Sequence, residues 1–144
     1  MSDLEIAEIR RFNRYYTNLL GLLDQHILSS DYSLAEVRVL YEIEKNTNIT
    51  MRMLSEILTM DEGYLSRILK KLQKDGLIER RKSPSDGRAY LLSLTEKGRS
   101  QIQEMHLRSD QQIAGFLSPL SAEQKTKLVQ HMQSIENILS GLPK

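Results

Sequence analysis

The segment 86–98, D-G-R-A-Y-L-L-S-L-T-E-K-G, constrains the fold more than any other part of the chain. The turn-forming run S-P-S-D-G, residues 83–87, overlaps the start of this segment. It separates two runs that are typical of antiparallel strands, 77–82 and 89–94. Thr95 follows the second run directly and favours a helix N-cap. The sequence therefore predicts a β-hairpin that leads straight into a helix of about residues 96–117.

Apolar residues on both sides of the hairpin recur every three or four positions, which is the spacing of helices. One long stripe covers 4–28, and a last one ends at about Ser140. Four of the predicted helices are each preceded by a residue that favours the helix N-cap. These residues are Ser33, Thr50, Asp61 and Ser121. Ser33 and Ser121 are each followed three residues later by Glu or Gln, which makes a capping box. Gly76 stands where the helix begun at Asp61 should end. The two short helices in the middle predict a helix-turn-helix.

The length indicates one domain, or one domain with a dimerisation extension, and the composition suits a helical protein and excludes several chemistries. The 144 residues include 7 Gly, 3 Pro and no Cys, so disulfides, thiol redox sensing and cysteine-ligated metals are excluded. The three histidines are far apart and lack an i, i+4 ligand pair, and we expect no metal site. No Gly-rich phosphate loop or nucleophile elbow is present, so neither an enzyme nor a bound cofactor is indicated. Without a long apolar run we expect a cytoplasmic protein with no membrane association.

Positive charge is concentrated in one short part of the chain. Eight basic and three acidic residues lie between Arg67 and Arg88, a local charge of +5 in a chain of net charge +1. A basic patch on an otherwise acidic molecule suggests a site for a polyanion such as nucleic acid. A solvated surface with chance clustering explains the same numbers.

The helix that follows Asp61 should present a compact, basic outer face. Small residues at its start would let it approach base edges in the major groove, and lysines further along would suit phosphates. The residues predicted for the major groove are Gly63, Tyr64, Ser66, Arg67, Lys70 and Lys71. The alternative is an ordinary amphipathic surface helix with a solvated lysine face.

At the hairpin tip, Asp86 lies two residues before Arg88, close enough for a carboxylate to orient the guanidinium. An arginine presented in this way fits a narrow minor groove. A surface ion pair worth about 0–1 kcal/mol is the plainer interpretation. The residues predicted for DNA binding by the hairpin are Arg81, Lys82, Ser85, Asp86 and Arg88.

The pattern D-x-R-x3-L-x-L-T-x2-G resembles the wing signature of the MarR family of winged-helix transcription regulators. It is formed by Asp86, Arg88, Leu92, Leu94, Thr95 and Gly98. The preceding run L-S-R-I-L-K-K-L-Q-K-D-G-L-I-E-R, residues 65–80, resembles the recognition helix and first wing strand of that family. The order of helices is similar over nearly the whole chain.

The resemblance implies a mainly α fold with a small β-hairpin, in which a winged helix-turn-helix lobe of about 33–98 is flanked by helical regions. Residues 1–30 and 99–144 would form the dimerisation region of a homodimer. The implied function is binding of double-stranded DNA at a pseudo-palindromic operator, with repression favoured. Ser66 and Arg67 would then contact the major groove, and Arg88, oriented by Asp86, the minor groove.

Many members of the family are released from DNA by small phenolic or aromatic acids, so the resemblance also implies a possible small-molecule effector. Four tyrosines lie on segments that would border such a pocket: Tyr15, Tyr16, Tyr32 and Tyr41. Each of them is also explained as an ordinary packing residue. The alternative from another class is a winged helix that docks an acidic protein partner through its basic face.

Overall fold

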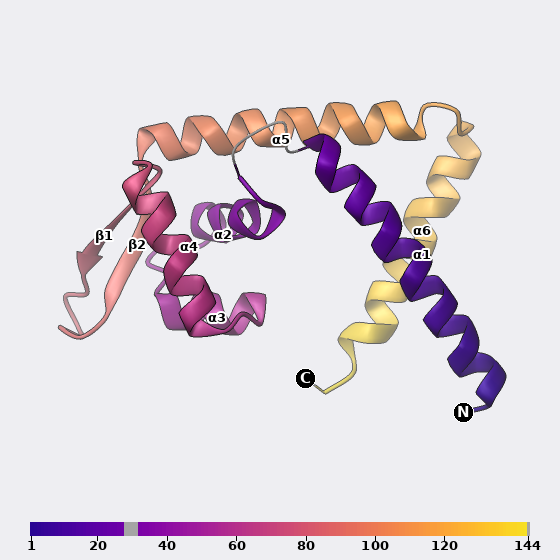
Figure 1. Ribbon diagram of the computed structural model, residues 1–144, viewed down its shortest axis with the longest axis horizontal. Coiled ribbons are helices and arrows are strands. Elements are labelled where there is room, and N and C mark those ends of the chain that lie inside the picture. The colour runs from indigo at the N-terminus through magenta and orange to yellow at the C-terminus, as the bar shows by residue number, and fades with distance from the viewer. Residues whose placement is uncertain (28–31, 144) are drawn as a thin grey trace. The chain divides into compact units, whose positions relative to one another are not determined.

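The computed structural model describes the backbone of residues 1–27 and 32–143, and the side chains of residues 1–23 and 32–143. The elements in chain order are α1 (Asp3–Ile27), α2 (Leu34–Lys45), α3 (Met51–Leu58), α4 (Glu62–Lys74), β1 (Ile78–Lys82), β2 (Tyr90–Leu94), α5 (Glu96–Leu117) and α6 (Ala122–Ser140) (Figure 1). The predicted fold class, mainly α with one small hairpin, is confirmed. The predicted helix end at residue 28 and the predicted boundary near residue 30 lie outside the described residues.

The helices begin where their capping residues predict. The Ser33 hydroxyl accepts the Glu36 amide at 3.2 Å, while the Glu36 carboxylate accepts the Ser33 amide at 2.8 Å, so the capping box of α2 is complete. Thr50 and Asp61 accept backbone amides in the same way at the starts of α3 and α4. These bonds satisfy amide groups that a helix N-terminus otherwise leaves without partners.

The hairpin pairs β1 with β2 in antiparallel register, from Ile78 opposite Leu94 to Lys82 opposite Tyr90. Each strand begins one residue later than predicted. The Leu77 amide donates to the Leu72 carbonyl at 2.9 Å and thereby completes the end of α4 instead of the sheet. The sequence also did not predict the single bridge from Ile49, whose carbonyl accepts the Leu92 amide at 2.8 Å on the other side of β2.

Among the described residues, the buried apolar core is formed by α2, α3, α4, the hairpin and the first half of α5, together with Ile49 and Leu77 from the segments between them. Leu40, Leu54, Leu65, Leu72 and Leu77 are among its fully buried side chains. Burial of a leucine side chain contributes about 1.5–3 kcal/mol, so the stability of the winged lobe comes largely from this cluster.

The junction between α4 and α5 is a close backbone contact. Gly76 adopts a left-handed conformation with φ of 77°, which glycine tolerates at the end of a helix. The Thr95 hydroxyl donates to the Gly76 carbonyl at 2.6 Å and accepts the Gly98 amide at 3.0 Å. Thr95 therefore caps α5, as predicted, and also fastens it to the end of α4.

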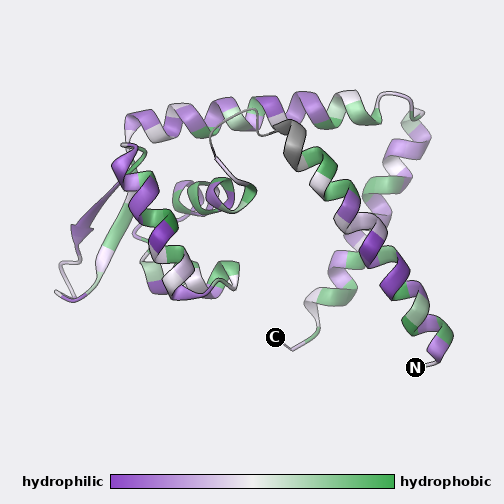
Figure 2. Ribbon diagram, viewed as in Figure 1, coloured by the Kyte–Doolittle hydropathy of each residue, from purple (hydrophilic) through white to green (hydrophobic). Residues whose placement is uncertain are grey.

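The terminal helices contribute no described buried side chain. Apolar residues recur along α1 and α6 (Figure 2), and all the described ones are exposed or only half-buried. The chain divides into two compact units, Met1–Ser109 and Asp110–Lys144, and the boundary falls within α5. Among the described residues, no helix is both long and apolar enough to cross a membrane.

Candidate nucleic-acid interface

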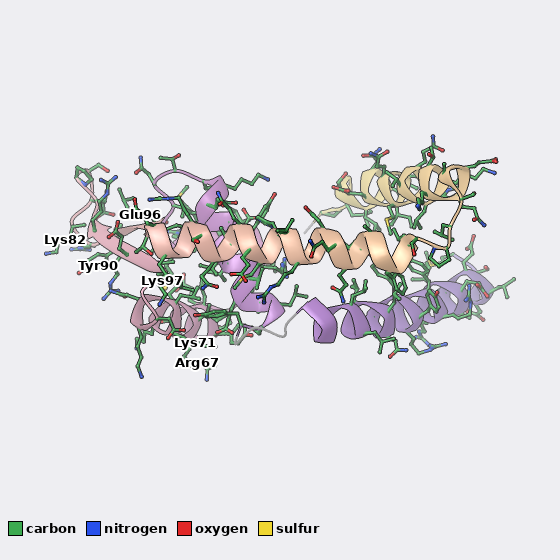
Figure 3. The ribbon with its side chains drawn as sticks, turned by 90° about the horizontal axis from the view of Figure 1, so that it is seen from above. Arg67, Lys71, Lys82, Tyr90, Glu96 and Lys97 are labelled. Atoms are coloured by element: carbon green, nitrogen blue, oxygen red, sulfur yellow. The ribbon has the colours of Figure 1, made fainter. Side chains whose placement is uncertain are left out.

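The inner face of α4 fixes which of its residues face outward. Leu65, Ile68, Leu69 and Leu72 are buried in the core. The residues predicted for the major groove therefore lie on the remaining faces, where Ser66 is half-buried and the other five are exposed: Gly63, Tyr64, Arg67, Lys70 and Lys71. Figure 3 shows Arg67 and Lys71 projecting from this helix.

The first turn of α4 is compact. Asp61 caps the helix through the Tyr64 amide at 3.1 Å, and a Cβ at Gly63 would come within 3.1 Å of the Asp61 carboxylate. The Arg67 guanidinium lies 6.0 Å from the centre of the Tyr64 ring, at the limit of a cation–π contact. The helix start thus combines little bulk with one arginine and one aromatic hydroxyl.

The tip of the hairpin is held by its own hydrogen bonds. The Asp86 carboxylate accepts the Arg88 backbone amide at 3.0 Å, and the Asp86 carbonyl accepts the Ala89 amide at 3.1 Å. Ser85 pairs with Ser83 through their hydroxyl groups at 3.1 Å. The aspartate therefore shapes the turn by an Asx-type bond. The predicted carboxylate–guanidinium pair is not among the ion pairs of the described residues.

The three basic residues of β1 have different surroundings. The Arg80 guanidinium lies 4.7 Å from the centre of the Tyr90 ring, a diagonal neighbour on the same face of the sheet. Arg81, on the opposite face, donates to the Asn48 side chain at 3.0 Å. Lys82 is exposed at the end of the strand. Figure 3 shows Lys82 and Tyr90 together on the hairpin.

A cleft of about 420 Å³ separates α4 from the wing, which is the hairpin β1–β2 with its tip. It brings together four of the predicted residues: Ser66, Lys70, Asp86 and Arg88. Several other lining residues were not predicted from the sequence, among them Thr50, Arg52, Gln73, Arg80 and Tyr90. Arg80 could have been found from the alternation of β1, because it shares a strand face with Lys82. The cleft carries four cationic side chains and one carboxylate.

Lys71 has a different environment from the other basic residues of α4. Its ammonium lies 2.9 Å and 3.1 Å from the two carboxylate oxygens of Glu36 and 5.1 Å from the centre of the Tyr32 ring. Burial raises the pKa of the Glu36 carboxyl, but hydrogen bonds from Ser33 and the Lys71 ammonium outweigh it, so that the pKa lies below its ordinary value. The DNA contact predicted for Lys71 stays a prediction.

The four tyrosines predicted for an effector pocket have separate surroundings. Tyr15 is largely exposed, and Tyr16 stacks on Phe12 with ring centres 5.6 Å apart. The Tyr32 hydroxyl donates to Asp75 at 3.1 Å. Tyr41 meets the ring of His106 edge-on. None of the four tyrosines lines the cleft beside the wing, or a second cleft lined by Ile43, Asn48, Arg81 and Leu91 among others.

Comparisons with known proteins agree on one family. The family model described as MarR family matches residues 30–89. The transcriptional regulator PetP of Rhodobacter capsulatus is 31% identical over 128 residues, which cover 81% of this chain and 75% of the relative. The regulator BilQ of Clostridium symbiosum is 35% identical over 93 residues, which span 65% of each protein, so the chain matches a little under two thirds of that relative.

Solved structures show the same fold. A crystal structure of a mutant MarR from E. coli has a TM-score of 0.79 and 26% identity, and the match covers 88% of this chain and 93% of that one. A mutant MarR from E. coli complexed with operator DNA has a TM-score of 0.75 and 27% identity over 93% and 99% of the two chains.

The fold and its basic face define a class of protein, the winged helix-turn-helix transcription regulators. Within that class, the chain belongs to the MarR family. This is a family of transcriptional regulators and not of enzymes.

Proposed function

We propose that the chain binds double-stranded operator DNA as a homodimer and represses transcription, with α4 in the major groove and the wing in the adjacent minor groove. The observation that carries the proposal is the cleft between α4 and the wing, whose lining includes the basic residues Arg52, Lys70, Arg80 and Arg88 and one acidic residue, Asp86. Such a concentration of cations on one lobe suits the closely spaced phosphates of a duplex.

The proposed contacts divide between reading bases and holding the backbone. Arg67 and Ser66, near the start of α4, read base edges, because an arginine can bond guanine in a bidentate manner. Lys70, a turn further on, holds a phosphate and carries no sequence information. Gly63 and Tyr64 complete the surface that approaches the groove.

In the wing, Arg88 enters the minor groove, where a narrow groove concentrates negative potential. Arg81, Lys82 and Ser85 hold the flanking phosphates in this proposal. Asp86 supports Arg88 by shaping the turn that presents it.

The homodimer is supported by the apolar surface of the terminal helices. On α6, Ile135 and Ile138 are exposed, as are Phe12 and Leu20 on α1, and a cluster of large exposed apolar side chains is typical of an interface. Release by a small aromatic or phenolic acid is also part of the proposal, and it rests on the family resemblance alone.

Binding to duplex DNA across a salt series tests the proposal. We expect the logarithm of the affinity to fall linearly with the logarithm of salt concentration, by a slope of about 0.9 for each phosphate contacted. Lys70→Gln combined with Arg88→Gln removes two cations that are proposed to contact DNA and should reduce the magnitude of that slope by about 0.9 for each of them. Lys127→Gln, a change in an exposed lysine of α6 that pairs with Glu123, is the matched control and should leave the slope unchanged. Absence of DNA binding, with binding of an acidic protein in its place, would contradict the proposal.

A further inference from the structure

Glu36 is the one charged side chain that is buried among the described residues, with 7% of its surface exposed. It lies in the first turn of α2, and its carboxylate accepts the Ser33 amide in the capping box. A carboxylate removed from water needs a cation or several donors to compensate for its lost hydration. The Lys71 ammonium from α4 meets that need, at 2.9 Å from one oxygen and 3.1 Å from the other.

A second contact joins the same two regions. The Tyr32 hydroxyl donates to the Asp75 carboxylate at 3.1 Å, and Asp75 follows Lys71 by four residues, so both lie on one side of the helix end. The Lys71 ammonium also lies over the Tyr32 ring. The second half of α4 is thus tied to the beginning of α2 at two positions, through Glu36 and through Tyr32.

The ion pair and a phosphate contact make competing demands on Lys71. If the ammonium moved to a DNA phosphate, the Glu36 carboxylate would lose its cation while still largely removed from water, which is strongly unfavourable. Lys70 faces no comparable demand, because none of the ion pairs among the described residues includes it, and it lines the cleft beside the wing. The two adjacent lysines of α4 therefore differ in their partners. Lys71 pairs with a buried carboxylate, and Lys70 lines the cleft beside the wing.

We propose that Lys71 is a positioning residue and not a phosphate contact: paired with Glu36, it sets the orientation of α4 against α2 and so the fit of α4 to DNA. This inference rests on the proposed DNA-binding function. It replaces the phosphate role that the basic pattern of α4 predicts for this lysine.

The test is a double-mutant cycle on DNA affinity with Glu36→Gln, Lys71→Met and the double variant. If the pair positions α4, each single change weakens binding by roughly three- to tenfold, which lies within the range of coupling found between contacting residues. The double variant should bind DNA at least as tightly as the single variant with the lower affinity, because either single change already removes the interaction between Glu36 and Lys71. The salt slope should stay that of the wild type in all three, since no phosphate contact is removed.

Two further variants separate positioning from other roles. Lys71→Arg retains the pair with Glu36 and should restore wild-type affinity, which a general loss of packing would not predict. Lys70→Met is the matched control for a lysine that does contact phosphate, and it should reduce the salt slope by about 0.9. Thermal unfolding of each variant, followed by circular dichroism, identifies any that are not folded at the temperature of the binding assay.

The outcomes are distinct. If Glu36→Gln binds as well as the wild type or better, while Lys71→Met lowers the salt slope as Lys70→Met does, Lys71 is a phosphate contact and the positioning role is overturned. If the wild type itself binds no DNA, the proposed function fails instead.

Discussion

Gly98 is the residue at which α5 passes against the end of α4. A Cβ built there would lie far inside van der Waals contact with a backbone atom, the carbonyl oxygen of Leu77. We therefore expect Gly98→Ala to lower the free energy of unfolding by about 1–3 kcal/mol or more, as overpacking does. The helix-favouring effect of alanine, about 1 kcal/mol, is too small to offset the clash.

Gly115 is the matched control on the same helix, because a Cβ there meets nothing within 4 Å. Gly115→Ala should be neutral or stabilise the protein by up to about 1 kcal/mol. Urea unfolding of the two variants measures both effects. Equal stability of the two would show that the close approach at Leu77 is not required.

Glu36 should make stability depend on pH in a definite direction. Its pKa in the folded chain lies below the ordinary value of 4.5, so the folded state favours the ionised carboxylate. The stability that it contributes is fully present above pH 4.5 and is lost as the pH falls through the folded pKa.

Comparison of the wild type with Glu36→Gln isolates this contribution from those of other carboxylates. The difference in free energy of unfolding should be largest near pH 7 and should shrink below the ordinary carboxyl pKa of 4.5. Urea unfolding at several pH values measures it, and a difference that grows on acidification would mean that the pKa is raised and not lowered.

At the scale of elements, local chemistry predicted the helices well because their ends are determined within three or four residues. Ser33, Thr50, Asp61, Thr95 and Ser121 all cap helices, as their positions in the sequence predict. The strand starts were predicted less accurately, since the Leu77 amide donates to the Leu72 carbonyl at the end of α4, and the Ala89 amide donates to the Asp86 carbonyl within the turn.

Two side-chain contacts could not be predicted from the sequence, and the first of them is in the wing. The spacing of Asp86 and Arg88 is equally compatible with a bond to the guanidinium and with a bond to the backbone amide. The structure has the second. Likewise, the pair of Glu36 and Lys71 joins residues 35 positions apart, and no local pattern indicates which lysine of α4 a buried glutamate will meet.

The wing arginine should be required for binding and not for folding. Arg88→Ala should weaken operator binding by about 1–3 kcal/mol without changing the unfolding temperature, because Arg88 is exposed. Gel-shift titration measures the affinity. Asp86→Asn keeps an oxygen that can accept the Arg88 amide and should bind at least as well as the wild type. A loss of binding in Asp86→Asn would instead favour a charge pair with the guanidinium.

At the scale of the whole molecule, the domain boundaries and the dimer stay predictions. The winged lobe has its own core, whereas α1 and α6 have no described buried side chain, and a second copy of the chain would supply what covers them. We expect a dimer of twice the 16.7 kDa chain mass in sedimentation at micromolar concentration.

Ile135→Asp on α6 should shift that equilibrium toward the monomer, because it places a charge on the apolar stripe. Asn137→Asp is the control, since it adds the same charge two residues away, on another side of the helix. A monomeric wild type would contradict the predicted dimer.

The hairpin has one further consequence, which concerns solubility. Among the described residues, Ile49 pairs with the outer side of β2, while β1 has no strand beyond it. An unpaired strand edge can recruit the same edge of another molecule and so start aggregation. Here the exposed strand reads E-R-R-K after its first residue, and Figure 2 shows it as hydrophilic. Like charges on two such edges repel each other, so the basic residues that we propose for DNA binding also keep the wings of different molecules apart. Replacing them with neutral side chains would remove both effects together.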